Sequence, residues 1–192
     1  IAIGSSALTA NTTGGYNTAI GRRTLKANTT GAQNTSVGYQ SLNANTTGTD
    51  NIAVGSSTLQ SNTIGNQNIA IGTQALVYNT TGGANVASGN QAMFSNTTGN
   101  HNAAYGTSTL RFNTTGNYNI AMGTQALYAN TTGAYNTALG YSSLALATTA
   151  NFNTAVGGNS LGATTSGGYN TGVGQNALSS NTTGANNTAF GS

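Results

Sequence analysis

A single 17-residue motif repeats along the whole chain without insertion or deletion. From Asn11 it reads Asn-Thr-Thr-Gly-x-x-Asn-Thr-Ala-Ile-Gly-x-x-Ala-Leu-x-Ala, and its positions are numbered here as columns 1 to 17. Residues 1–10 are the tail of a preceding copy, residues 11–180 are ten full repeats, and residues 181–192 begin a final copy. The array predicts one domain of stacked repeats. Because both ends fall within a repeat, we expect a segment of a longer protein.

Three columns of the repeat are nearly invariant. Column 11 is always Gly, and column 15 is Leu except at Met93. Column 7 is always Asn, and a column that recurs without slippage is expected to stack on itself. Stacked Asn side chains can hydrogen-bond to one another and to turn backbone, which predicts a structural ladder. Its members are Asn17, Asn34, Asn51, Asn68, Asn85, Asn102, Asn119, Asn136, Asn153, Asn170 and Asn187.

The composition of the repeat disfavours a helix and favours short strands. Each Gly in a helix interior costs about 1 kcal/mol, and Asn and Thr also disfavour helix interiors. Residues 17–21 have the features of a five-residue strand, and residues 126–132 supply a second. The sequence therefore predicts an all-β fold, a parallel β-solenoid or β-roll of 17-residue coils with two short strands per coil. We expect the Gly residues at positive φ or at crowded corners.

The strand pattern also predicts what lies inside each coil. The small residue of column 9, such as Ala121, suits a thin core between two close walls, and Leu of column 15 would fill it. Alternation then turns columns 8 and 10 outward, for example Ile69 and Ile71. Such an apolar stripe is too large for the exposed surface of a monomer. Either the opposite phase holds and these columns fill the core, or the stripe packs against identical chains, which we favour.

Columns 2 and 3 are Thr in nearly every copy, and adjacent strand residues face opposite sides. At least one Thr per coil should therefore form an outward row. A regular Thr array is typical of ice-binding solenoids, whereas Thr is also simply suited to exposed β positions. The candidate outward Thr surface comprises Thr12, Thr13, Thr29, Thr30, Thr46, Thr47, Thr97, Thr98, Thr114, Thr115, Thr131 and Thr132.

Charge is almost absent, which narrows the classes of function. Only 3% of residues are charged, and the net charge of +3 forms no basic stripe, so we expect no nucleic-acid partner. Asp50 is the only carboxylate side chain and His101 the only imidazole, which leaves no catalytic pair, triad or metal site. No enzyme activity or cofactor is expected. No apolar run approaches the ~20 residues that cross a bilayer, so no membrane insertion is expected.

Aromatic residues recur in column 6, where Asp50 and His101 also lie. They are Tyr16, Tyr118, Tyr135, Phe152 and Tyr169. Outward rings could contact carbohydrate or neighbouring chains, or they could stack coil on coil over a turn, an interpretation that we favour slightly.

Residues 17–21, Asn-Thr-Ala-Ile-Gly, resemble the Asn-Ser-Val-Ala-Ile-Gly motif in the head domains of trimeric autotransporter adhesins, and residues 1–8 resemble it more closely. Phage tail-fibre repeat arrays are similar. The resemblance implies a left-handed β-roll, three chains side by side, and a place outside the bacterial cell or on a virion fibre. This chain departs from the family in its longer repeat, with an added Asn-Thr-Thr-Gly such as residues 113–116.

Together these features favour an extracellular structural and adhesive fibre segment that associates with identical chains, as a trimer by resemblance. A host surface, a carbohydrate or ice are the candidate ligands. An ice-binding solenoid and a self-assembling filament subunit are the alternatives.

Overall fold

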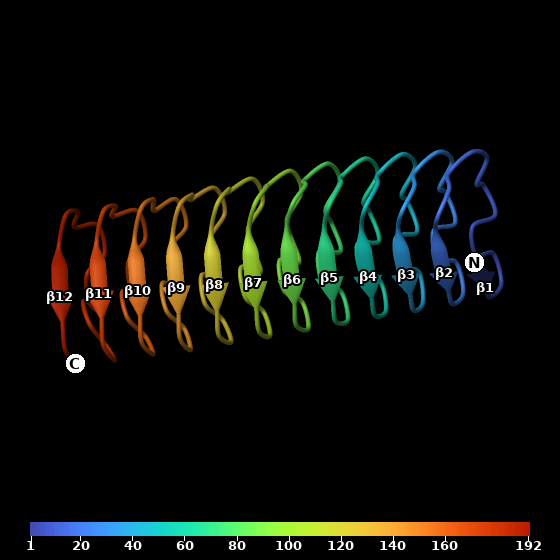
Figure 1. The fold of residues 1–192 in the computed structure, drawn as a ribbon. Helices are drawn as coiled ribbons and strands as arrows, with labels where there is room; N and C mark the ends of the chain where they lie inside the picture. Colours follow the sequence, from blue (N-terminus) through green and yellow to red (C-terminus); the bar gives the residue numbers. More distant parts are fainter.

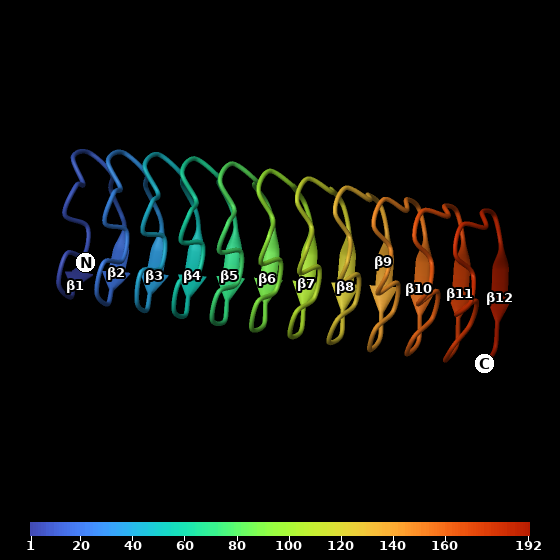
Figure 2. The ribbon, with the colours of Figure 1, turned by 180° about the vertical axis from the view of Figure 1, so that it is seen from behind.

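The computed structural model describes residues 1–192. The chain winds into a rod, and each coil contributes one strand to a single parallel sheet that runs along the rod (Figure 1). Every strand pairs with its neighbours in sequence, so the sheet order follows the chain from β1 to β12. Figure 2 shows the same succession from behind, with the two termini at opposite ends. The predicted parallel β-solenoid is confirmed. The strands are β1 (Ala2–Ile3), β2 (Thr18–Ile20), β3 (Thr35–Val37), β4 (Ile52–Val54), β5 (Ile69–Ile71), β6 (Val86–Ser88), β7 (Ala103–Tyr105), β8 (Ile120–Met122), β9 (Thr137–Leu139), β10 (Thr154–Val156), β11 (Thr171–Val173) and β12 (Thr188–Phe190).

The strand register equals the sequence repeat. Between β7 and β8, for example, Ala104 pairs with Ala121 and Tyr105 with Met122, an offset of 17 residues. Each column of the repeat therefore forms a straight row along the rod. With strands about 4.8 Å apart, eleven coil steps give a rod about 50 Å long.

The second predicted strand is absent, and the first is shorter than predicted. Strand β2 covers Thr18–Ile20 rather than residues 17–21, and residues 126–129 form turns. The reason is the backbone of columns 13 and 15, which is left-handed in every coil. Gln125 has a φ of 59° and Leu127 a φ of 50°. Extended strands require negative φ, so this wall of the coil cannot be a strand.

A left-handed backbone at a Leu residue costs about 1–2 kcal/mol, and burial offsets this cost. The Leu127 side chain is fully buried, which stabilises the fold by roughly 1.5–3 kcal/mol. Its N–H donates to the carbonyl oxygen of Ser143 in the next coil at 2.9 Å. The wall without strands is thus hydrogen-bonded from coil to coil. Of 127 backbone hydrogen bonds only 21 lie within the strands, so most of the backbone bonding lies in the turns and loops.

The two glycine columns have the two expected roles. Gly123 of column 11 has a φ of +127°, and a Cβ there would stand 2.6 Å from the carbonyl oxygen of Gly140. Gly99 of column 4 is crowded instead, because a Cβ would stand 2.5 Å from the Oδ1 atom of Asn96 in its own coil and 2.5 Å from the carbonyl oxygen of Gly116 in the next. Both glycines permit the close approach of successive coils.

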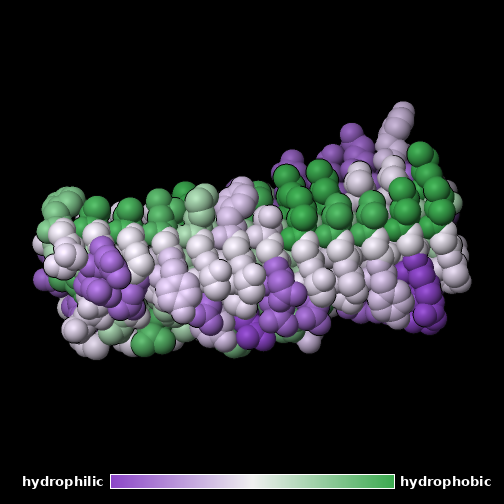
Figure 3. All heavy atoms as spheres, turned by 90° about the horizontal axis from the view of Figure 1, so that it is seen from below, coloured by the Kyte–Doolittle hydropathy of each residue, from purple (hydrophilic) through white to green (hydrophobic).

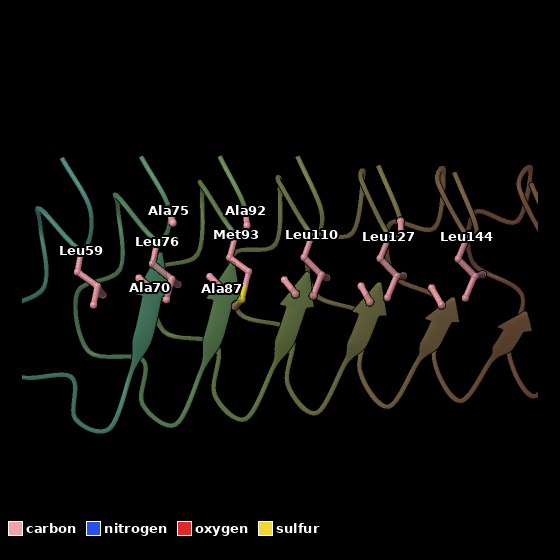
Figure 4. Packing of buried hydrophobic residues seen from close by; sticks show 14 of the residues in the cluster. Leu59, Ala70, Ala75, Leu76, Ala87, Ala92, Met93, Leu110, Leu127 and Leu144 are labelled. Carbon is pink, nitrogen blue, oxygen red and sulfur yellow. The ribbon is translucent and has the colours of Figure 1, made fainter. Parts of the chain in front are cut away.

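The core is a thin double row running along the rod axis. Figure 4 shows Leu76, Met93 and Leu110 in line, with Ala70 and Ala87 of the strands facing them. The column 9 and column 15 residues of the interior coils are fully buried. The inward phase predicted for Ala121 is therefore correct, and columns 8 and 10 face outward.

Candidate functional site: the outer rows of the rod

The column 7 asparagines form the predicted ladder, and all of them except the terminal Asn187 are buried. Asn68 is typical: its N–H and its Nδ2 both donate to Oδ1 of Asn51, at 3.0 and 3.2 Å. The same Nδ2 donates to the carbonyl oxygen of Gly82 at 2.9 Å. Because Asn85 in turn donates twice to Oδ1 of Asn68, every hydrogen-bonding atom of the amide is satisfied. This column is structural and presents no surface.

A second amide ladder, which the sequence reasoning missed, occupies column 1. Asn79 is fully buried, and its Nδ2 donates to Oδ1 of Asn62 at 2.8 Å and to the Gly82 carbonyl oxygen at 2.9 Å. The Gly82 carbonyl is therefore shared by the two ladders. The signal in the sequence was the constant spacing of three residues between this Asn and the Gly of column 4.

The two threonine columns differ in exposure. Thr98 of column 3 is exposed, whereas Thr97 of column 2 is half-buried and its hydroxyl donates to the carbonyl oxygen of Thr114 at 3.0 Å. The outward row is consequently one residue wide. The exposed members of the predicted surface are Thr12, Thr13, Thr30, Thr47, Thr98, Thr115 and Thr132, and the half-buried members are Thr29, Thr46, Thr97, Thr114 and Thr131.

The outer face of the sheet has a long apolar row. Figure 3 shows it as a green line along the rod, interrupted near the middle. The row is column 10, and Ile71 and Met122 are 45% and 51% exposed. Ser88 and Tyr105 are the interruption. Its apolar members are Ile3, Ile20, Val37, Val54, Ile71, Met122, Leu139, Val156, Val173 and Phe190. No residue of columns 8 or 10 is charged.

The column 6 aromatic residues stack coil on coil. Tyr118 lies against His101 and Tyr135 with ring centroids 4.9 Å apart in both pairs and nearly parallel planes. Phe152 and Tyr169 continue the stack. Neighbouring rings therefore cover one another's faces and leave their edges to solvent. Tyr16 lies outside the stack because the next coil has Gln33 in this column.

The only carboxylate and the only imidazole side chain both lie in column 6, but far apart along the rod. Asp50 and His101 are both exposed, and three coils separate them. No cluster of metal-ligating side chains and no enclosed cavity is present. The chain has no helix, and so none that could span a membrane. The surface of the rod consists of parallel rows of equivalent side chains, one row for each outward column of the repeat.

Comparison with protein-family models, with curated proteins and with solved structures finds no match to this chain.

Proposed function

We propose that this chain is a structural segment of an extracellular fibre that associates side by side with identical chains through the outer face of its sheet. The observation that carries the proposal is the uncharged apolar row of column 10, in which Ile71 and Met122 are about half exposed. Exposed apolar rows of this length are typical of interaction surfaces.

A second copy of the chain is the partner that fits this row best. The apolar side chains recur once per coil, about every 4.8 Å, and an identical rod has apolar side chains at the same interval. A partner with another spacing would lose register after a few coils. The absence of charge from columns 8 and 10 removes like-charge repulsion between two copies.

The size of the face agrees with association that depends on rod length. Three residues per strand and about 4.8 Å per coil give a strip about 50 Å by 10 Å, or roughly 500 Å² per chain. Two facing strips bury about 1,000 Å², close to the lower limit for specific interfaces. Each added coil adds area, so longer arrays should associate more tightly. A trimer, with chains side by side, is the assembly expected from the resemblance to autotransporter heads.

Sedimentation equilibrium with two matched variants tests the proposal. Ile71→Thr changes the sheet face, and Ile64→Thr makes the same change at a 50% exposed residue in column 3, off that face. Polar residues already occur in both columns, at Ser88 and at Thr81, so both variants should fold. We expect Ile71→Thr to raise the dissociation constant about tenfold, for a loss of roughly 1.4 kcal/mol, and the addition of Val54→Thr to raise it further.

In the same experiment Ile64→Thr should leave the dissociation constant unchanged. A monomeric wild-type chain at all concentrations, or equal weakening by both variants, would contradict the proposal.

Ice binding is a second candidate, and the exposed Thr row of column 3 is the observation in its favour. Thr98 and Thr115 are exposed at a constant interval of one coil. Against it, the row is one residue wide because the neighbouring hydroxyls of column 2 donate to backbone carbonyls. An ice recrystallisation assay decides: no inhibition at micromolar protein removes this candidate.

A further inference from the structure

Four consecutive coils differ from the rest of the array in columns 16 and 17. Elsewhere these columns hold mostly small or polar residues, but here they hold Tyr78, Phe94, Arg111, Phe112 and Tyr128, which we call the aromatic–arginine patch. The core of the same coils stays apolar and fully buried, since Leu76, Leu110 and Leu127 lie in one row with Met93, the only residue of column 15 that is not Leu (Figure 4). Folding therefore does not require the patch, and a binding role can explain it.

The patch is an ordered cluster. The Tyr78 and Phe94 rings meet edge to face with centroids 5.0 Å apart, and Phe112 and Tyr128 do the same. Arg111 joins the two pairs. Its Cζ atom lies 5.6 Å from the Phe94 centroid and 5.3 Å from the Phe112 centroid, and its Nη1 donates to the Tyr128 hydroxyl at 3.2 Å. The guanidinium is thus held in place by rings on several sides.

Arg111 has no acidic partner in the chain. The only carboxylate side chain, Asp50, is in another column three coils earlier, about 14 Å along the rod. The other cations, Arg22, Arg23 and Lys26, are five coils away. Its Nε atom is buried without a hydrogen-bond partner. A half-buried cation held between aromatic rings favours an anionic ligand with an apolar body.

The two exposed rings of the patch flank a small residue. Tyr78 and Phe112 are 51% and 40% exposed, and Ser95 lies between them in column 17. Two coil steps separate the rings by about 9.6 Å along the rod. The carbon-bound hydrogens of a sugar ring are attracted to the electron-rich face of an aromatic ring. A sugar acid combines such a face with a carboxylate, which matches an aromatic ring beside a guanidinium.

We propose that the aromatic–arginine patch binds an acidic carbohydrate, with a sugar ring against Tyr78 or Phe112 and its carboxylate on Arg111. The patch residues directly follow column 15, whose side chains face the strands across the core (Figure 4). The patch therefore lies on the wall opposite the sheet and stays open when the sheet faces associate. The inference is thus independent of the proposed association.

Isothermal titration of the full chain with trigalacturonate tests this inference, and the methyl ester of the same trisaccharide isolates the role of charge. Arg111→Gln and Phe112→Ala are the test variants. Gln60 and Ala27 already occupy these columns in other coils, so both variants should fold. Tyr141→Ala, at a 65% exposed ring in column 12, is the matched control.

We expect trigalacturonate to bind the wild type and the control with equal affinity. Its affinity for Arg111→Gln and for Phe112→Ala should be lower by a factor of about ten or more. The methyl ester should bind about as weakly to wild type as the acid binds to Arg111→Gln. No binding of trigalacturonate at millimolar concentration, equal binding of acid and ester, or an unchanged affinity in Arg111→Gln would overturn the assignment.

Discussion

The column 1 ladder is interrupted at one place, and this interruption gives a sharp test of the stacking geometry. Ala147 and Thr164 stand where other coils have Asn, and Oδ1 of Asn130 is buried without a hydrogen-bond partner. The coil that contains Ala147 also has Ala150 in column 4, which holds Gly in every other coil. A Cβ in column 4 would collide with the amide oxygen of the Asn in column 1 of the same coil, since a Cβ at Gly99 would stand only 2.5 Å from Oδ1 of Asn96. The two alanines are therefore expected to be coupled.

Restoring the ladder requires three substitutions. Ala147→Asn alone should destabilise the chain, because its amide oxygen meets the Ala150 methyl group. With Ala150→Gly the amide fits and donates to Asn130, but its own Oδ1 then lacks a donor. Thr164→Asn supplies that donor. Giving one buried acceptor a donor should raise the free energy of unfolding by about 1–3 kcal/mol, and each added hydrogen bond should raise it by about 0.5–1.5 kcal/mol. The added Gly should lower it by up to about 1 kcal/mol.

We therefore expect the triple variant to be more stable than wild type by about 1–3 kcal/mol. Urea and thermal unfolding followed by circular dichroism measure the change, and about 1 kcal/mol corresponds to a rise of roughly 2–4 °C in Tm at this chain length. The control is the cycle of Ala147→Asn with and without Ala150→Gly. If Ala147→Asn is tolerated equally well beside Ala150 and beside Gly, the reasoning is refuted.

Three further substitutions test other parts of the fold by the same unfolding measurements. Gln125→Asn should stabilise the rod by about 0.5–1 kcal/mol, because Asn adopts the left-handed backbone more readily; a loss of stability would show that the side chain has another role. Ala121→Phe should cost at least about 1–3 kcal/mol through overpacking of the thin core, and full tolerance would mean that this column is not interior. Asn68→Asp should be severely destabilising, by about 3–5 kcal/mol, because a buried carboxylate cannot donate to Asn51 or Gly82; an unchanged midpoint would contradict the ladder.

The sequence was sufficient for the features that one repeat determines locally. Gly123 had to occupy a special backbone conformation, and Asn68 had to stack on its own copies. These features follow from the identity of each residue and the exact period. Alternation also placed Ile120 and Met122 on the face opposite Ala121, but either face could have been the interior, and the buried Ala121 of the structure decides between them.

The features that were missed depend on how the backbone closes the coil. Leu127 gives no hint of a left-handed backbone, since Leu rarely adopts one, although Asn159 and Asn176 in column 13 are residues that favour it. Asn79 suited an exposed turn as well as a buried ladder, and only the shared Gly82 carbonyl distinguishes the two. Arg111 lay in a variable column, so its contacts with Phe94 and Phe112 became apparent only with the coils stacked.

Small-angle X-ray scattering of the wild-type chain, with the mass taken from forward scattering, tests side-by-side association most directly. The proposal predicts a mass of two or three chains, an enlarged cross-section and a rod length that stays near 50 Å. The mass and the cross-section should fall to those of a single rod on dilution or in the Val54→Thr/Ile71→Thr variant. A single-chain mass at high concentration, or a length that doubles while the cross-section stays that of one rod, would contradict association through the sheet face.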